Sequence, residues 1–218
     1  MKIPFIDIHT HHALNSDGVI SIRSWFLQDI DRQNDISIPF SAAIHPWHAA
    51  KFTAEQISKM LLNLIQQPKL IAIGEIGLDK LCNVDYQIQK EVFELQLKFA
   101  EDHQKPIIIH AVKSWNDLIV YLRRIKVPVI LHGYSEGIEL TKQLIDLGCY
   151  FSVGNSVLRI TSRFREAIQI IPFTSLFLET DDSNLNISEI YQEVSKIMDI
   201  SLEDFKIQIN KNFKTLFY

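Results

Sequence analysis

Histidines and acidic residues stand directly after several apolar segments of this chain. The first are His9 and His11, which follow the apolar run 3–8. Because side chains alternate in direction along an extended segment, a His-x-His pair can turn both imidazole rings to one side and bring them to one metal ion. A lone pair of this kind is a weak indication of a metal site. The prediction therefore depends on what later segments add.

Four later residues occupy the same position, each after an apolar run: Glu75, His110, His132 and Asp181. Imidazole and carboxylate groups suit Zn, Mn, Fe or Ni better than a calcium site. One such residue is more often a loop or capping residue, but six of them after five runs favour metal binding. We therefore predict that divalent ions bind to His9, His11, Glu75, His110, His132 and Asp181.

The apolar runs are rich in Ile and Val and alternate with segments of helical pattern. Runs that are apolar on both faces fit strands of a parallel sheet that is covered on both sides. Seven strands are predicted, at residues 3–8, 38–44, 70–73, 106–109, 127–131, 149–153 and 176–178. Helices are predicted over 85–102, 188–198 and 201–217, the last two with Ser188 and Ser201 as capping residues.

This alternation predicts an α/β fold, a single TIM-type (β/α) barrel that is small or distorted, with an open doubly wound sheet as the alternative. In such a barrel the carboxyl ends of the strands form the face where active sites are built, so the six residues would meet there. The 218 residues are 47% hydrophobic, and seven Gly and seven Pro leave no segment rich enough to be a linker. We therefore expect one domain over residues 1–218.

The formal charge of −4 argues against a broadly basic surface that binds nucleic acid unaided. A phosphate-bearing substrate would need local positive charge, which metal ions can supply. The sequence shows no export signal and no apolar stretch that could cross a bilayer, so a cytoplasmic protein is expected. Cys82 and Cys149 are predicted to be free thiols, with Cys149 buried.

At this point the sequence resembles the TatD family of metal-dependent hydrolases, within the wider amidohydrolase-like barrels. The most specific segment is Gly74-Glu75-Ile76-Gly77-Leu78-Asp79, which is similar to the family's Gly-Glu-x-Gly-Leu-Asp. Nearly the whole chain takes part, through Asp7-Ile8-His9-Thr10-His11, Ile44-His45-Pro46, His132-Gly133-Tyr134-Ser135, Leu178-Glu179-Thr180-Asp181 and Asn212-Phe213.

The resemblance implies a TIM-type barrel with two adjacent divalent ions, of Zn, Mn, Mg, Ni or Fe. His9, His11 and Asp181 would hold one ion, His110 and His132 the other, and Glu75 would bridge them. The family's activity is phosphodiester hydrolysis, commonly as a deoxyribonuclease, and some members act on other ester or aminoacyl bonds. A nucleic-acid or phosphoester substrate is therefore expected, while the oligomeric state is left open.

Two cations a few Å apart lower the pKa of a bound water to about 7 and polarise a phosphoryl oxygen. Asp181, a carboxylate at the metal, is the predicted general base, and Glu75 the second catalytic residue. His45 is a candidate for contact with the scissile phosphate, with a loop position fixed by Pro46 as the equal alternative. Asp79 is interpreted as holding a ligand histidine in the required tautomer, or else as a turn residue.

The chain departs from the family pattern in its substrate-binding surface. Val112 stands where the family often has Arg, so Lys113 beside it is a candidate substrate contact. Lys80-Leu81 replaces the usual aromatic residues, and the loop after Asp181 is short. Trp47 could stack on a base, although a packing role is favoured.

Other functions stay open. Asp7-Ile8-His9-Thr10-His11 with Ser16-Asp17-Gly18 also resembles the opening of the polymerase and histidinol phosphatase family, which would mean phosphomonoester hydrolysis. That family expects Thr-Asp-His after its second strand, where this chain has Ile44-His45-Pro46-Trp47. A barrel that hydrolyses a C–O or C–N bond, and a non-catalytic interaction protein on the same barrel, are the remaining alternatives.

Overall fold

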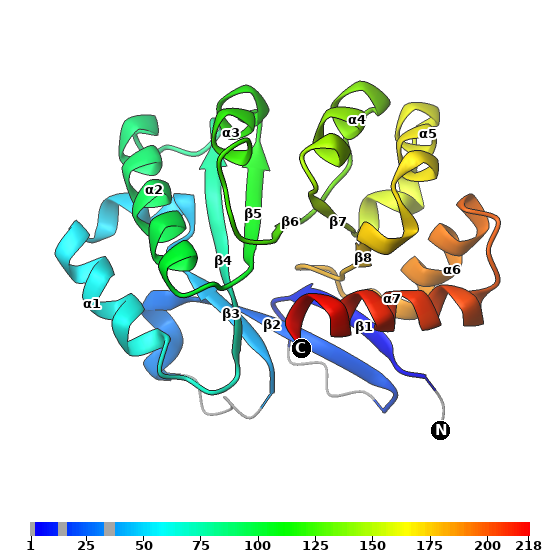
Figure 1. The fold of residues 1–218 in the computed structure, drawn as a ribbon, viewed down its shortest axis with the longest axis horizontal. Helices are drawn as coiled ribbons and strands as arrows, with labels where there is room; N and C mark the ends of the chain where they lie inside the picture. Colours follow the sequence, from blue (N-terminus) through cyan, green and yellow to red (C-terminus); the bar gives the residue numbers. More distant parts are fainter. Residues whose placement is uncertain (1–2, 13–16, 33–37) are drawn as a thin grey trace. The chain divides into compact units, whose positions relative to one another are not determined.

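Strands and helices alternate along the chain (Figure 1). The computed structural model describes residues 3–12, 17–32 and 38–218, so Ser16 of the alternative opening motif lies outside it. The described chain divides into two compact units: unit 1 is Met1–Arg23 with Leu131–Tyr218, and unit 2 is Ser24–Ile130. The boundaries fall inside two strands, β2 (Val19–Phe26) and β6 (Val129–Leu131), each of which has residues in both units.

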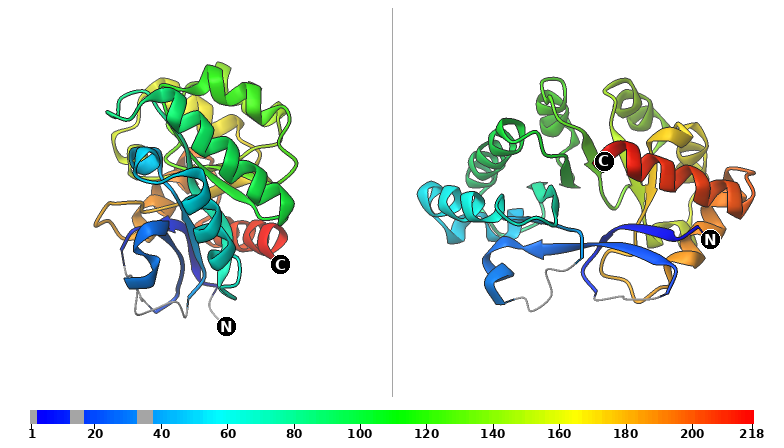
Figure 2. Two further views of the ribbon diagram at one scale, coloured as in Figure 1. Left: turned by 90° about the vertical axis from the view of Figure 1, so that its left-hand side faces the viewer. Right: turned by 60° about the horizontal axis from the view of Figure 1, so that its bottom comes forward.

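Unit 2 is continuous in the sequence and alternates strands with helices. Its elements, besides its shares of β2 and β6, are η1 (Leu27–Arg32), β3 (Phe40–Ala43), η2 (Pro46–Lys51), α1 (Ala54–Leu64), β4 (Leu70–Asp79), α2 (Tyr86–Asp102), β5 (Ile107–Val112) and α3 (Trp115–Leu122). β3 pairs in parallel with β4, and β4 with β5, where Gly77 stands opposite His110. Helices α1 and α2 lie side by side, and α2 packs on β4 (Figure 2).

Unit 1 joins the two ends of the chain. Its elements, besides its shares of β2 and β6, are β1 (Phe5–Thr10), α4 (Ile138–Asp146), β7 (Tyr150–Val153), η3 (Asn155–Arg159), α5 (Ser162–Ile170), η4 (Phe173–Ser175), β8 (Leu176–Leu178), α6 (Ile187–Ile197) and α7 (Leu202–Phe217). β1 pairs in parallel with β2, and β7 with β8. A parallel bridge between Thr10 and Asp181 joins β1 to the segment after β8. Helices α6 and α7 cover β1 and β8 (Figure 1).

Parallel strands that neighbour one another in sequence order are those of a TIM-type (β/α) barrel, so the predicted fold class is confirmed. All seven predicted strands are present, but the described residues contain an eighth, β2, which the sequence prediction missed. Its pattern is not a continuous apolar run, because Ser21, Arg23 and Ser24 interrupt it and Ile20 is partly exposed. A single domain over 1–218 stays a prediction.

The three predicted helices are present as α2, α6 and α7, but one cap is wrong. Ser201 caps α7 by accepting a hydrogen bond from the Asp204 amide, as predicted. For α6 the cap is Asn186 rather than Ser188: Asn186 and Glu189 form a reciprocal capping box, and Ser188 lies inside the first turn. The cap therefore lies two residues before the predicted one.

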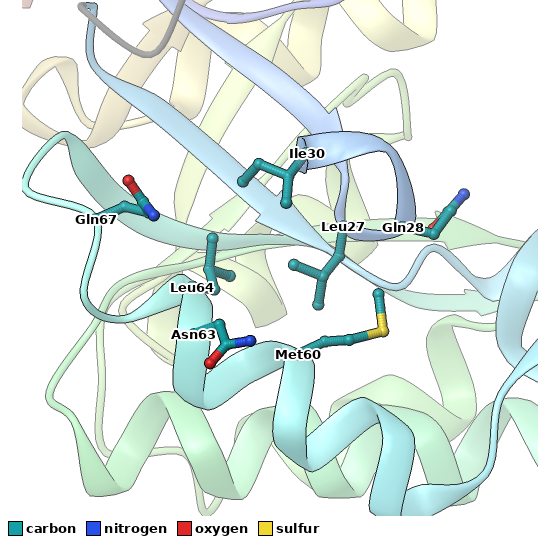
Figure 3. A pocket seen from close by; sticks show the side chains of 7 residues that line it. All are labelled: Leu27, Gln28, Ile30, Met60, Asn63, Leu64 and Gln67. Atoms are coloured by element: carbon teal, nitrogen blue, oxygen red, sulfur yellow. The ribbon is translucent and has the colours of Figure 1, made fainter. Parts of the chain in front are cut away.

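A small pocket lies between η1 and α1 in unit 2 (Figure 3). It has a volume of about 80 Å³, and apolar side chains from both elements face it, among them Leu27, Ile30, Met60 and Leu64. Both cysteines are free thiols and Cys149 is buried, as predicted. Among the described residues, no helix combines the length and apolar character needed to cross a membrane.

Candidate metal centre

In unit 1, His9, His11 and Asp181 lie together. Each offers a ligand atom, and these atoms lie within 4.8 Å of one another. Asp181 Oδ1 is 3.7 Å from His9 Nε2 and 3.6 Å from His11 Nε2. The backbone fixes this arrangement, because the Asp181 amide donates to the His9 carbonyl and the His11 amide donates to the Asp181 carbonyl, both at 3.0 Å. The bridge thus brings a C-terminal carboxylate to the N-terminal histidine pair.

Asp7 holds this bridge through hydrogen bonds with Thr180. The Thr180 hydroxyl donates to Asp7 Oδ2 at 2.6 Å, and the Thr180 amide donates to Asp7 Oδ1 at 3.0 Å. Burial of the Asp7 carboxyl raises its pKa to about 7, against the lowering effect of the two hydrogen bonds from Thr180. Since Thr180 immediately precedes Asp181, the first residue of the Asp-x-His-x-His motif holds the backbone that carries the carboxylate ligand.

Glu179 holds the third histidine of unit 1. His132 follows β6, and its Nδ1 lies 3.3 Å from Glu179 Oε1, which also accepts a 2.6 Å hydrogen bond from the Gly133 amide. A proton on Nδ1 that is donated to Glu179 places the lone pair of the His132 ring on Nε2, the tautomer that suits a metal ligand. Glu179 is fully buried, and its Oε2 has no hydrogen-bond partner among the described residues. His132, Glu179 and Asp181 form a second group of possible ligands.

In unit 2, His45, Glu75 and His110 form another such group. Glu75 is buried on β4, and its Oε2 lies 3.7 Å from both His45 Nε2 and His110 Nδ1. Ser24 donates to the other carboxylate oxygen, Oε1, at 3.2 Å. The Trp47 amide donates to His45 Nδ1 at 3.3 Å, so the neutral His45 ring carries its proton on Nε2. His45 therefore presents a hydrogen-bond donor toward this group rather than a lone pair.

Asp79 orients His110, as the sequence suggested. Its Oδ2 lies 3.4 Å from His110 Nε2 and accepts a 2.8 Å hydrogen bond from the Trp47 indole N–H. Burial works against ionisation of Asp79, but the hydrogen bonds from Trp47, the Leu81 amide and His110 lower its pKa below the usual value. A carboxylate that accepts from His110 Nε2 leaves the lone pair on Nδ1 directed toward Glu75.

Close contact between β4 and β5 places His110. Gly77 has φ 152°, and a methyl group there would collide with the His110 carbonyl oxygen. Only glycine allows this approach without strain. Ser114 fixes the end of β5 by donating to the Leu78 carbonyl at 2.7 Å. The Gly-Leu-Asp portion of the motif therefore acts through strand packing as well as through Asp79.

The predicted ligands thus fall into two sets. Unit 1 brings together His9, His11, His132 and Asp181, and unit 2 brings together Glu75 and His110. Bridging by Glu75 and sharing of one ion by His110 and His132 stay predictions. Imidazole lone pairs beside carboxylates in each unit fit transition-metal binding.

The two candidate substrate contacts differ in setting. His45 is buried beside Glu75, whereas Lys113 is exposed after β5 at a positive φ of 51°. The sequence predicts no role for Glu179, although this carboxylate directly follows the apolar run 176–178 and so carries the same signal as Asp181. Trp47 packs against the rings of His45 and His110 but is 52% exposed, so stacking on a base stays a prediction beside the favoured packing role.

Comparison with known proteins decides the family. The sequence model of the TatD-related DNase family matches residues 26–218. The chain belongs to this family. Over 180 residues it is 28% identical to a metal-dependent hydrolase of Methanocaldococcus jannaschii, which covers 76% of this chain and 71% of that protein. It is 32% identical over 145 residues to the human 3′-5′ RNA nuclease TATDN2, covering 63% of this chain and 19% of that protein.

The fold of this TatD-family chain matches that of a solved relative. The crystal structure of the TatD homologue YjjV from Escherichia coli superposes with a TM-score of 0.81 at 24% identity, covering 100% of this chain and 99% of that one. The chain is therefore a TatD-family metal-dependent hydrolase with the family's fold, as the motifs predicted.

Proposed function

We propose that this TatD-family hydrolase cleaves phosphodiester bonds of nucleic acid, with DNA as its substrate, using divalent ions bound by the predicted ligands. The observation that carries the proposal is the gathering of His9, His11 and Asp181 within 4.8 Å in unit 1. A divalent ion at these groups would supply Lewis acidity toward a phosphoryl oxygen and would let water ionise near neutral pH. Zn, Mn, Mg, Ni and Fe are the candidate ions, and two ions are proposed.

The chain's own residues would then perform the proton transfer and the contact with the anion. Asp181 is the proposed general base, since its carboxylate is partly exposed while both neighbouring histidines keep it in place. His45 is the proposed phosphate contact, because its Nε2 carries the ring proton. A hydrogen bond from a neutral imidazole to a phosphoryl oxygen becomes stronger as negative charge develops on that oxygen in the transition state.

RNA is the second candidate substrate, because a relative is named a 3′-5′ RNA nuclease. The family resemblance places DNA first, so both are assayed. The test begins with metal analysis of the purified protein, followed by turnover of single-stranded DNA, single-stranded RNA and an aminoacyl ester. Turnover of the ester alone would contradict phosphodiester hydrolysis, and failure to bind any transition metal would favour the interaction-protein alternative.

The variant that tests the base is Asp181→Asn, with Asp182→Asn as its matched control. Asp182 is the adjacent carboxylate and its side chain is 84% exposed, so its replacement should leave turnover unchanged. Asp181→Asn should abolish turnover while the far-UV circular dichroism spectrum stays the same. Equal turnover in the Asp181 variant would show that another group takes the proton.

A further inference from the structure

An open cavity of about 520 Å³ lies beside Asp79 in unit 2. Trp47, Asp79, Leu81, Cys82, Asn83 and Val84 line it. This volume is within the range of roughly 300–1,000 Å³ that is typical of ligand pockets. Two of the lining side chains are large, apolar and exposed, Trp47 at 52% and Leu81 at 64%. They give the cavity two apolar surfaces that a planar apolar group could contact.

The indole of Trp47 is held in a fixed position. Its N–H donates to Asp79 Oδ2 at 2.8 Å, and its ring packs against the rings of His45 and His110 at interplanar angles of 75° and 78°. With 52% of its surface exposed, Trp47 still offers surface that a planar ligand can contact. Because the hydrogen bond orients the ring before any ligand arrives, stacking on it would cost little side-chain entropy.

The loop that forms the other wall is also held in place. The Leu81 amide donates to Asp79 Oδ1 at 2.8 Å. Gln89 accepts from the Asp79 amide and donates to the carbonyls of Asp79 and Val84. Asp79 therefore fixes both walls of the cavity while it orients His110, so a molecule in the cavity lies next to the His45–Glu75–His110 group.

We propose that this cavity is a nucleobase subsite, in which one base of a single-stranded substrate stacks on Trp47 and contacts Leu81. The inference rests on the proposed phosphodiesterase function and adds the part of the substrate that is recognised. A planar base offers a face to the indole, and base–aromatic stacking tolerates any sequence because every base has such a face. Bases within a duplex are already stacked, so the subsite favours a single strand.

The test is a double-mutant cycle between Trp47 and the base. Substrates are a thymidine trinucleotide and three versions of it, each with one nucleotide replaced by an abasic residue. For the wild-type protein, one abasic position should lower kcat/KM by roughly 5- to 100-fold. Trp47→Leu should show a similar loss on the complete trinucleotide and no further loss at that abasic position. An equal abasic penalty in both proteins would overturn the proposal.

Two further variants separate stacking from structural damage. Trp47→Phe keeps an aromatic face but loses the hydrogen bond to Asp79, so it should retain most of the abasic penalty. Leu81→Ala should reduce that penalty, whereas Leu62→Ala, an equally conservative change at a residue 56% exposed on α1, should leave it unchanged. The same reduction in both leucine variants would contradict a local subsite.

Binding measurements distinguish failure of the subsite from failure of the proposed function. The same four oligonucleotides are titrated calorimetrically into the Asp181→Asn variant with and without Trp47→Leu. A base-dependent affinity that disappears with Trp47 supports the subsite even where no hydrolysis is found. If the protein hydrolyses the oligonucleotides but its affinity for them does not depend on the base, the subsite is refuted and the phosphodiesterase function is retained.

Discussion

Replacing Glu179 with glutamine should weaken metal binding in unit 1. Glu179 Oε1 accepts a 2.6 Å hydrogen bond from the Gly133 amide and lies 3.3 Å from His132 Nδ1. The Glu179 side chain is fully buried. A glutamine carbonyl can accept from the same two donors, so the fold should survive. The negative charge, which makes His132 a stronger ligand through its other nitrogen, is lost.

The expected size follows from the role of such carboxylates. Removing the partner of a metal-binding histidine typically lowers metal affinity about 10- to 100-fold, which is about 1.4–2.7 kcal/mol. A larger loss would mean that Glu179 itself binds the ion, because Glu179 is grouped with His132 and Asp181 as a possible ligand and its Oε2 has no hydrogen-bond partner within the part of the chain that the structure describes.

The assay is competition between the protein and a chromophoric chelator for Zn²⁺ and Mn²⁺ at constant pH. Glu139→Gln serves as the matched control, because that carboxylate is 80% exposed on α4 of the same unit. Urea unfolding of the metal-free proteins checks that the fold is retained. Wild-type affinity in Glu179→Gln, with lost affinity in Asp181→Asn, would refute the argument that Glu179 supports the site.

Three further predictions concern stability and thiol reactivity. Gly77→Ala should lower the free energy of unfolding, measured with urea, by about 1–3 kcal/mol, because the added methyl group collides with the His110 carbonyl oxygen. The loss should exceed that of Gly148→Ala, since Gly148 also has a positive φ but has open space around it. Iodoacetamide should label Cys82 and spare Cys149 in the native protein at pH 8, because burial raises the Cys149 pKa to about 12; mass spectrometry would reveal labelling at Cys149. Hydrogen bonds lower the Asp117 pKa from 3.8 to about 2, so its stabilisation is present above about pH 4 and lost as pH falls through 2. The difference in urea midpoint between wild type and Asp117→Asn should therefore shrink from pH 6 to pH 3, and a constant difference would contradict it.

The sequence predicted the candidate metal ligands, because each is a histidine or an acidic residue that follows an apolar run. His132 does follow β6 directly, but Glu75 lies in the middle of β4 and His110 within β5, because these strands extend past their apolar portions. Strand length depends on pairing with neighbouring strands, which the local pattern does not reveal. The predicted position after a strand is therefore wrong for Glu75 and His110, and also for His9, which lies inside β1.

Hydrogen-bond partners were harder to predict than ligands. Ser24, which donates to Glu75, lies in the strand that the prediction missed, so its proximity to residue 75 could not be inferred. A role for Glu179 at the site could have been predicted, since it stands two residues before Asp181 in the same motif. Trp47, in η2, combines packing against His45 and His110 with 52% exposure, and residue type alone does not predict this combination because aromatic residues are usually buried.

Unit 1 has a consequence for the order of events during protein synthesis. His9 and His11 leave the ribosome about 170 residues before Asp181 does. At about 5–20 residues per second, roughly 10–30 s separate them. Unit 2 is contiguous in the sequence and can fold during this interval. Strand β1 cannot form its bridge to Asp181 until β8 and the segment after it have been synthesised. A nascent chain that has not reached Asp181 lacks the carboxylate, so binding of an ion by the complete His9–His11–Asp181 group can only follow the synthesis of unit 2.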